Sequence, residues 1–238
     1  DIDINRPIDL EEKYDTVVHL AALVKANESV NVPIQYYITN LNGTMNVINR
    51  IQCDNFILAS TGLAELCNNP YAISKRAAED VVREYCTQHS DRNYTIFRFY
   101  NVIGTSGYSP TNQDGLMAAL ARSVESKSFT IYGNDYDTPD GTAIRDYVHI
   151  LEICEAIRLA IERPSVVPDA EVTPWVENLG HGVGHSVLEM VDIFQRENLV
   201  NFRVKALPRR PGDVPCSVLD NVSPYMKEMV PFNELLRM

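Results

Sequence analysis

The sequence predicts an α/β fold in which a parallel β-sheet carries helices on both faces. Two observations lead to this prediction: strand-like and helical runs alternate along the first hundred residues, and the character of the sequence changes after Gly104. A strand–helix–strand–helix–strand order is typical of parallel strands joined by right-handed crossovers. We therefore expect a doubly wound parallel sheet in residues 1–103 and a smaller C-terminal α/β domain in residues 104–238.

The elements of the first part follow in order. Residues 14–22 read as a buried strand that runs into a loop, and residues 33–50 as a helix. Residues 55–60 form the next strand, residues 71–89 an amphipathic helix, and residues 94–100 a third strand. The expected apolar row of the first helix is Ile34, Tyr37, Ile38, Leu41, Met45 and Ile48; that of the second is Ile73, Ala77, Val81 and Tyr85. Polar residues of the second helix are Lys75, Arg76, Glu79, Asp80, Arg83 and Glu84.

The second part begins with a loop rich in glycine, serine and proline, which places the domain boundary near residues 101–112. A helix over residues 116–126, a strand over residues 129–132 and a turn-rich loop over residues 133–142 follow. The stretch around residues 146–165 is expected to pack back on the first domain.

A glycine-rich run from Gly180 to Gly184 follows the strand-like residues 175–179. It resembles a dinucleotide fingerprint, but it lacks the third-glycine spacing and the acidic residue about 20 positions further on. We interpret it as a tight turn, with Ser186 capping a helix that runs to Phe194.

The composition of the chain limits the classes of partner that we expect. The chain has 238 residues, of which 45% are hydrophobic and 22% charged, and a net charge of −11. No basic run is available to neutralise phosphates, so no nucleic-acid partner is expected. No apolar run approaches the ~20 residues that cross a bilayer, so no membrane partner is expected. Five scattered cysteines without a C-x-x-C pair indicate reduced thiols and a cytoplasmic protein.

Tyr71 and Lys75 are four residues apart in the second helix and therefore share one helical face. A nearby cation favours the phenolate, which would move the pKa of a tyrosine down from about 10 toward use as a base. Thr61, at the end of a strand, could hold the same substrate hydroxyl. The bare Y-x-x-x-K pattern is common on surface helices, so it acquires meaning only from its surroundings.

Other polar residues have simpler interpretations, and no metal site is expected. His149 suits packing or helix capping. Asp135, Asp137 and Asp140 lack the spacing of a calcium loop and suit a solvated loop. His181 and His185 are four apart but have no evident third ligand.

Longer motifs extend through nearly the whole chain. They are Val17–Ala22, Glu28–Val30, Asn40–Thr44, Phe56–Thr61, Asn69–Lys75, Arg98–Gly104, Ile131–His149, Glu177–Gly180 and Arg209–Asp213. Together they resemble the extended short-chain dehydrogenase/reductases, and among them the UDP-glucose (UDP-galactose) 4-epimerases. The resemblance implies a Rossmann-like sheet, an NAD cofactor, a UDP-sugar substrate and inversion at C4 through a 4-keto intermediate. It also suggests a homodimer formed by the helices near residues 33–50 and 71–89.

The resemblance assigns roles position by position. The catalytic residues would be Thr61, Tyr71 and Lys75. The NAD site would be lined by Asp3, Ile4, Ala21, Ala22, Leu23, Asn40, Ser60, Tyr71, Lys75, Phe99 and Tyr100. The nucleotide sugar would be held by Thr61, Asn101, Leu116, Tyr132, Arg145, Arg210, Asp213 and Ser217. Arg145 and Arg210 suit the diphosphate, because guanidinium binds phosphate oxygens bidentately.

The chain departs from the family pattern in several places. The family opens with a strand, a glycine-rich turn and a helix that receive the NAD pyrophosphate, whereas the first glycine here is Gly43. The segment between Thr61 and Tyr71 is also short, and Gly115 replaces a polar residue. We expect that the first βαβ unit is missing from this sequence and belongs to a longer protein.

Two alternatives to an epimerase remain open. A nucleotide-sugar dehydratase or decarboxylase would call for an extra acid after Thr61, where Gly62 and Leu63 stand. A non-catalytic UDP-sugar-binding protein would fit the absent glycine-rich turn but not the intact trio. In the pattern of the family that the chain resembles, a bulky aromatic at the position of Ser217 would border the sugar C2 substituent. The serine therefore predicts acceptance of N-acetylhexosamines as well; the alternative is that Ser217 is an ordinary loop residue and the register has slipped around Pro215.

Overall fold

In the computed structural model, residues 2–10, 12–89, 92–104, 115–162, 175–226, 230–231 and 236 are described. The chain divides into two compact units. Unit 1 comprises Asp1–Phe99 with Ile157–Asn178, and unit 2 comprises Tyr100–Ala156 with Leu179–Met238. Within the described ranges, no helix combines the length and apolar character that crossing a membrane requires.

Unit 1 is built on a four-stranded sheet. Its strands are β1 (Lys13–His19), β2 (Gln52–Thr61), β3 (Asn93–Phe99) and β7 (Trp175–Leu179), in the order β1-β2-β3-β7. β2 runs parallel to both β1 and β3, and the register pairs Thr61 with Phe99 at the carboxyl ends. The predicted α/β fold with a parallel sheet and flanking helices is confirmed.

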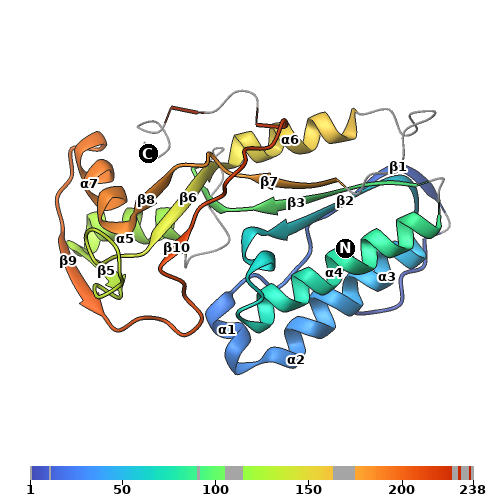
Figure 1. Ribbon diagram of the computed structural model, residues 1–238, viewed down its shortest axis with the longest axis horizontal. Helices are drawn as coiled ribbons and strands as arrows, with labels where there is room; N and C mark the ends of the chain where they lie inside the picture. The colour runs from blue at the N-terminus through green and yellow to red at the C-terminus, as the bar shows by residue number, and fades with distance from the viewer. Residues whose placement is uncertain are drawn as a thin grey trace. The chain divides into compact units, whose positions relative to one another are not determined.

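One continuous helical segment connects β1 to β2 after the short helix α1 (Ala26–Asn31). It consists of α2 (Pro33–Tyr36), the π-helical turn η1 (Tyr37–Asn42) and α3 (Gly43–Arg50), with helical backbone angles at both junctions. The short 3₁₀ helix η2 (Gly62–Glu65) and the long helix α4 (Pro70–Gln88) then connect β2 to β3. Figure 1 shows α3 and α4 side by side against the sheet of unit 1.

The limits of the helix over residues 33–50 match the prediction, but its predicted apolar face is only partly right: Ile48 is buried, whereas other members of the row are exposed. Ile34, Ile38 and Met45 are 67%, 45% and 45% exposed. The buried residues of this segment are Tyr36, Asn40, Gly43, Thr44, Val47 and Ile48. Polar side chains can be buried on this face because they find hydrogen-bond partners within the protein. One example is the Thr44 hydroxyl, which donates to the Asn40 carbonyl at 2.7 Å. Hydrophobic periodicity cannot anticipate such a face.

Among its described residues, unit 2 contains one mixed sheet and one strand pair. The sheet has the order β10 (Cys216–Ser217), β6 (Ile144–His149) and β4 (Asn101–Ile103), with β8 (Gly184–Ser186) antiparallel to β6. β5 (Ser128–Tyr132) and β9 (Arg203–Leu207) form a parallel pair. The helices are α5 (Leu116–Ser126), which matches its prediction, α7 (Val187–Glu197), and the first part of α6 (Ile150–Ile161).

The glycine-rich run after β7 is held by hydrogen bonds to Asp146 of unit 2. The Asp146 carboxylate accepts hydrogen bonds from the backbone N–H of His181 at 2.7 Å and of Gly182 at 2.9 Å. A Cβ at Gly180 would lie only 2.8 Å from Asp146 Oδ2, which explains the glycine. Ser186 caps α7 in a reciprocal capping box with Glu189, as the sequence predicted.

The remaining polar residues of the sequence analysis have structural contacts. His149 is 8% exposed, and its Nδ1 accepts from the Leu151 N–H at 3.2 Å at the start of α6, which is a capping contact. The imidazole of His181 bonds to the Glu152 carboxylate at 2.9 Å, and that of His185 to Glu189 at 2.9 Å.

Candidate active site

The predicted catalytic residues meet where β2 ends and α4 begins. Asn69 caps α4 by accepting from the Ala72 N–H at 2.9 Å, and Pro70 occupies the first turn. This start places Tyr71 and Lys75 on the inward face, where they are 9% and 3% exposed. Thr61, the last residue of β2, is 7% exposed, and its hydroxyl makes a side-chain hydrogen bond with Tyr71.

Burial dominates the proton affinities at this cluster. It raises the pKa of Tyr71 to about 12, and the hydrogen bond with Thr61 offsets this only in part. Burial also lowers the pKa of Lys75 to about 8, against the raising influence of the Glu79 carboxylate. The expectation that Lys75 alone would bring the pKa of Tyr71 below 10 is therefore not met, because desolvation of the phenolate outweighs it.

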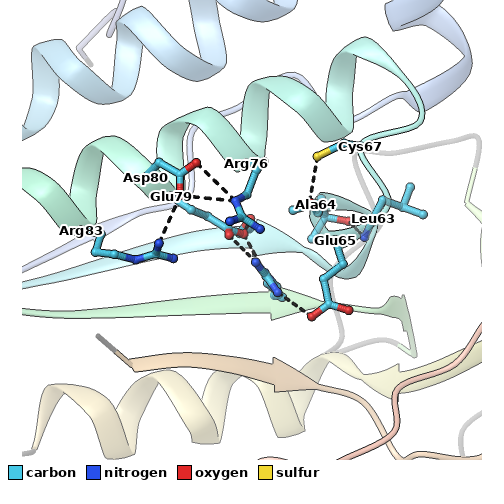
Figure 2. A network of polar contacts seen from close by, with 11 residues as sticks. Leu63, Ala64, Glu65, Cys67, Arg76, Glu79, Asp80 and Arg83 are labelled. Carbon is cyan, nitrogen blue, oxygen red and sulfur yellow. Dashed lines mark hydrogen bonds and ion pairs between the residues drawn. The ribbon is translucent and has the colours of Figure 1, made fainter. Parts of the chain in front are cut away.

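A buried ion pair that the sequence analysis did not identify lies one helical turn after Lys75. The Glu79 carboxylate is fully buried and accepts from Arg98 Nε at 2.9 Å and from Arg98 Nη2 at 2.6 Å (Figure 2). The Ser60 hydroxyl also donates to Glu79. The sequence pattern places Glu79 among the polar residues of an amphipathic helix. Its four-residue spacing from Lys75 indicates that the two side chains share one helical face, and this is the signal that predicts a buried Glu79.

Asn40 joins the loop after β1 to helix α4. Its side chain accepts from the Leu23 N–H at 2.8 Å and donates to the Leu23 carbonyl at 2.9 Å and to the Ser74 hydroxyl at 3.0 Å. Ser74 in turn donates to the Tyr71 carbonyl at 2.8 Å. Of the residues assigned to NAD, Asn40 and Ser60 thus already bond to protein groups that shape the site.

Tyr36 packs directly behind Tyr71. The two rings meet edge to face with centroids 6.3 Å apart. The Tyr36 hydroxyl is anchored by donating to the Lys25 carbonyl at 2.8 Å, with the Glu28 carboxylate 3.1 Å away. This contact fixes the ring of Tyr71 from the side of α2.

The other residues assigned to the cofactor are spread over both units. Asp3 accepts from the Asn5 N–H at 3.0 Å, and Ile4 packs against Gly43. Ala21 is exposed, and Ala22 and Phe99 are half-buried. Tyr100 belongs to unit 2, where its N–H donates to the Leu179 carbonyl at 3.1 Å.

Unit 2 brings several of the predicted substrate residues together. The Arg210 guanidinium carbon lies 3.7 Å from the centre of the Tyr132 ring, a stacked arrangement that fixes both side chains. Arg145 on β6 is the register partner of Ser217 on β10, so these two also lie side by side. The Asp213 N–H donates to the Arg210 carbonyl at 3.3 Å in the turn that precedes β10.

Asn101 and Leu116, also assigned to the nucleotide sugar, make contacts within the fold of unit 2. Asn101 donates from its side chain to the Asp146 carbonyl at 3.3 Å, and Leu116 begins α5 and packs against the core of unit 2.

Tyr136 is a buried polar residue of unit 2 that the sequence did not predict. It is 5% exposed, and the Arg209 guanidinium carbon lies 4.2 Å from the centre of its ring. Its hydroxyl has no hydrogen-bond partner in the described part of the chain.

Comparison with known proteins agrees with these motifs. Residues 2–173 match the model of the NAD dependent epimerase/dehydratase family. UDP-glucose 4-epimerase of Yersinia enterocolitica is 31% identical over 85% of this chain and 66% of the relative. The enzyme of Drosophila melanogaster is 31% identical over 88% of this chain and 67% of the relative. The chain spans about two thirds of the length of these curated relatives.

Solved structures give the same result. The UDP-glucose 4-epimerase of Bifidobacterium longum, in complex with NAD+ and UDP, superposes with a TM-score of 0.81 at 26% identity, over 93% of this chain and 74% of that one. The UDP-Glc/GlcNAc 4-epimerase of Campylobacter jejuni has a TM-score of 0.70 at 26% identity, over 93% of this chain and 75% of that one. The chain belongs to the NAD dependent epimerase/dehydratase family.

Proposed function

We propose that the protein catalyses NAD-dependent inversion at C4 of the hexose of a UDP-sugar, through a 4-keto intermediate. The observation that carries the proposal is the buried set of Thr61, Tyr71 and Lys75, which combines a hydroxyl, a phenol and an ammonium at one strand end. The similarity to UDP-glucose 4-epimerases supports the choice of reaction.

The residues of unit 1 fit NAD in one specific respect. Lys75 is 3% exposed, and burial lowers its pKa to about 8. A buried ammonium is costly unless hydrogen-bond acceptors reach it, and the hydroxyls of a ribose are acceptors of that kind. When bound, NAD supplies the acceptor for the C4 hydride and returns it.

The proton chemistry falls to Tyr71. Its phenol would take the proton of the sugar 4-hydroxyl while Thr61 orients that hydroxyl. Because burial raises the pKa of Tyr71 to about 12, the phenolate needs a neighbouring cation. Lys75 supplies that cation up to its own pKa of about 8.

The side chains that bind the UDP part of the substrate would come from unit 2. Arg145 and Arg210 would bind the diphosphate, and stacking on Tyr132 holds Arg210 ready. A firm hold on UDP with few bonds to the hexose would let the 4-keto sugar present its other face without leaving. We assign Asn101, Leu116 and Asp213 to the same nucleotide site.

The sugar range would depend on Ser217. Ser217 is the register partner of Arg145 in the pair of β10 and β6. We propose that its small side chain would leave room for an N-acetyl group. Ser217→Tyr should abolish turnover of UDP-N-acetylhexosamines and spare UDP-glucose, because an overfilled pocket excludes the larger ligand. Equal loss on both substrates would remove Ser217 from the choice of sugar.

A second copy of the chain is the partner that unit 1 suits best. Ile34, Ile38 and Met45 are exposed on the segment of α2, η1 and α3, and Ile73 is 38% exposed on the adjacent α4. Exposed apolar residues grouped on two neighbouring helices are typical of an interface. We propose a homodimer through these two helices.

The reaction is tested with the full-length protein and purified UDP-sugars. Incubation with UDP-galactose should yield UDP-glucose, detected by proton NMR of the anomeric signals, and the reverse reaction should reach the same equilibrium. Parallel incubations with the N-acetyl forms measure the sugar range. Absence of C4 inversion with every UDP-hexose, in protein shown to bind UDP, would rule out the proposed function.

A further inference from the structure

Glu79 is a fully buried carboxylate close to the proposed chemistry. It lies four residues after Lys75 on α4 and so shares its helical face. A buried carboxylate is retained only when other groups satisfy it, because desolvation of an unpaired charge is costly. The partners of Glu79 therefore indicate what it organises.

Those partners come from two strands. Arg98, on β3, donates to both Glu79 oxygens, at 2.9 and 2.6 Å, and Ser60, on β2, donates to Oε1. Ser60 and Arg98 are register partners in the parallel pair of β2 and β3. One carboxylate thus joins the catalytic helix to the ends of two adjacent strands.

Arg98 extends the network to the connection that follows Thr61. Its Nη1 donates to the Glu65 carboxylate at 2.6 Å, at the end of η2 (Figure 2). Thr61 itself caps η2 by accepting from the Leu63 N–H at 3.3 Å. The backbone that carries Thr61 is therefore held before it by Ser60 and after it by Glu65, and both bonds converge on the pair of Glu79 and Arg98.

Glu79 is also the negative charge that acts on Lys75. The other ionisable groups around this end of α4 are Tyr71 on the same helix, His19 on β1, Tyr36 on α2, Glu28 on α1, Arg98 on β3 and Glu65 on η2. The His19 ring bonds to the Thr44 hydroxyl at 3.0 Å, and burial together with the charge of Lys75 lowers its pKa to about 4. His19 is thus neutral near pH 7, Glu28 is bound by Tyr36, and Arg98 is matched by two carboxylates.

We propose that Glu79 is a positioning residue of the reaction: it fixes Thr61 through Ser60 and Arg98, and it keeps Lys75 cationic. The inference deepens the proposed function and rests on it. Glu79 would touch neither substrate nor cofactor and would act only through these neighbours.

The test compares two charge-removing variants at adjacent positions of α4. Glu79→Gln removes the buried charge. Asp80→Asn removes an exposed one, whose carboxylate pairs with Arg76 and Arg83 at 3.3 Å on the surface (Figure 2). The Lys75 side chain is titrated in the full-length protein by NMR of its carbon next to the ammonium, assigned with Lys75→Arg.

In Glu79→Gln, the Lys75 pKa should fall by about one unit or more, and turnover of UDP-glucose should fall by about 10- to 100-fold. Asp80→Asn should leave both unchanged. If the single variant folds poorly, the double variant Glu79→Gln/Arg98→Met also removes the guanidinium that has lost its Glu79 partner and keeps only Glu65 of the two carboxylates. It should keep the lowered Lys75 pKa and the slow turnover.

An unchanged Lys75 titration in Glu79→Gln, or full recovery of turnover in the double variant, would overturn the proposal and reduce Glu79 to a structural partner of Arg98. The titration does not depend on activity. A wild-type protein that turns over no UDP-sugar would therefore contradict the proposed function, while the Lys75 titration would still decide the role of Glu79.

Discussion

Helices α4 and α7 both bury apolar side chains in the core of their own unit, but α4 also buries charged ones. α7 buries Met190, Val191, Ile193 and Phe194, as an amphipathic helix is expected to do. Next to apolar residues such as Val82, α4 buries Ser74, Lys75 and Glu79, and it leaves Ile73 38% exposed. Buried charges cost free energy of folding and are common at functional sites, so we infer that α4 serves the proposed chemistry as well as the core, whereas α7 serves the core.

The largest expected effect concerns the phenol of α4. Tyr71→Phe in the full-length protein should lower turnover of UDP-glucose by about 10²–10⁴-fold, because it removes the proposed general base. Binding of UDP, measured by calorimetry, should persist, because the proposed diphosphate contacts lie in unit 2. Turnover close to that of the wild type would remove Tyr71 from the mechanism.

One substitution in each helix should change the free energy of unfolding of the protein in opposite directions. Phe194→Ala in α7 should lower the free energy of unfolding by about 3–5 kcal/mol through the cavity it leaves. Lys75→Met in α4 should raise it by roughly 3 kcal/mol at pH 7 while abolishing turnover. Urea unfolding of both variants provides the measurement.

The sign for Lys75 follows from its pKa of about 8 in the folded chain, which lies below the ordinary lysine value of 10.5. Between these values the unfolded chain binds more protons, so stability rises with pH. The destabilisation by Lys75 is fully present below pH 8 and disappears as pH approaches 10.5. A gain from Lys75→Met that did not shrink over this range would show that Lys75 is not buried as a strained cation.

A smaller effect is expected at the proposed diphosphate contacts of unit 2. Arg145→Ala and Arg210→Ala should each weaken binding of UDP by about 1.5–3 kcal/mol, the value of a charge-assisted hydrogen bond. Arg209→Ala is the matched control, because Arg209 pairs with Asp135 at 2.8 Å and stacks on Tyr136. Unchanged UDP affinity in both Arg145→Ala and Arg210→Ala would place the diphosphate elsewhere.

The smallest effect on folding concerns the exposed apolar side chains of unit 1. Ile38→Asp should change the free energy of unfolding of the monomer by no more than about 0.5 kcal/mol, because Ile38 is 45% exposed. It should convert a dimer to a monomer in sedimentation, since a charge in an apolar interface is costly. Identical sedimentation of the wild type and the variant would argue against an interface at this position.

The order and limits of most helices and strands could be predicted from the sequence, but not which helix face is buried. Periodicity placed Ile34, Ile38 and Met45 inward because it assumes an apolar core. The actual inward residues, such as Asn40 and Glu79, are satisfied by partners 34 and 19 positions away along the chain. Only the sheet register and helix packing bring those partners together.

The candidate site was partly predictable for a related reason. The four-residue spacing placed Tyr71 and Lys75 on one face, and the end of β2 brought Thr61 to them. Glu79 and Arg98 were missed because their pairing depends on how α4 packs on the sheet. The roles assigned to the residues of unit 2 remain predictions.

The central claim, reversible oxidation at C4, is tested most directly with UDP-galactose that carries deuterium at C4. In the full-length protein we expect the UDP-glucose formed to keep the deuterium at C4, with no exchange into water, because a hydride leaves and returns within the site. Mass spectrometry of the isolated product measures the label, and Tyr71→Phe should slow its formation. Loss of deuterium to the solvent would instead show that C4 is deprotonated, and would contradict a transient 4-keto sugar formed by hydride transfer.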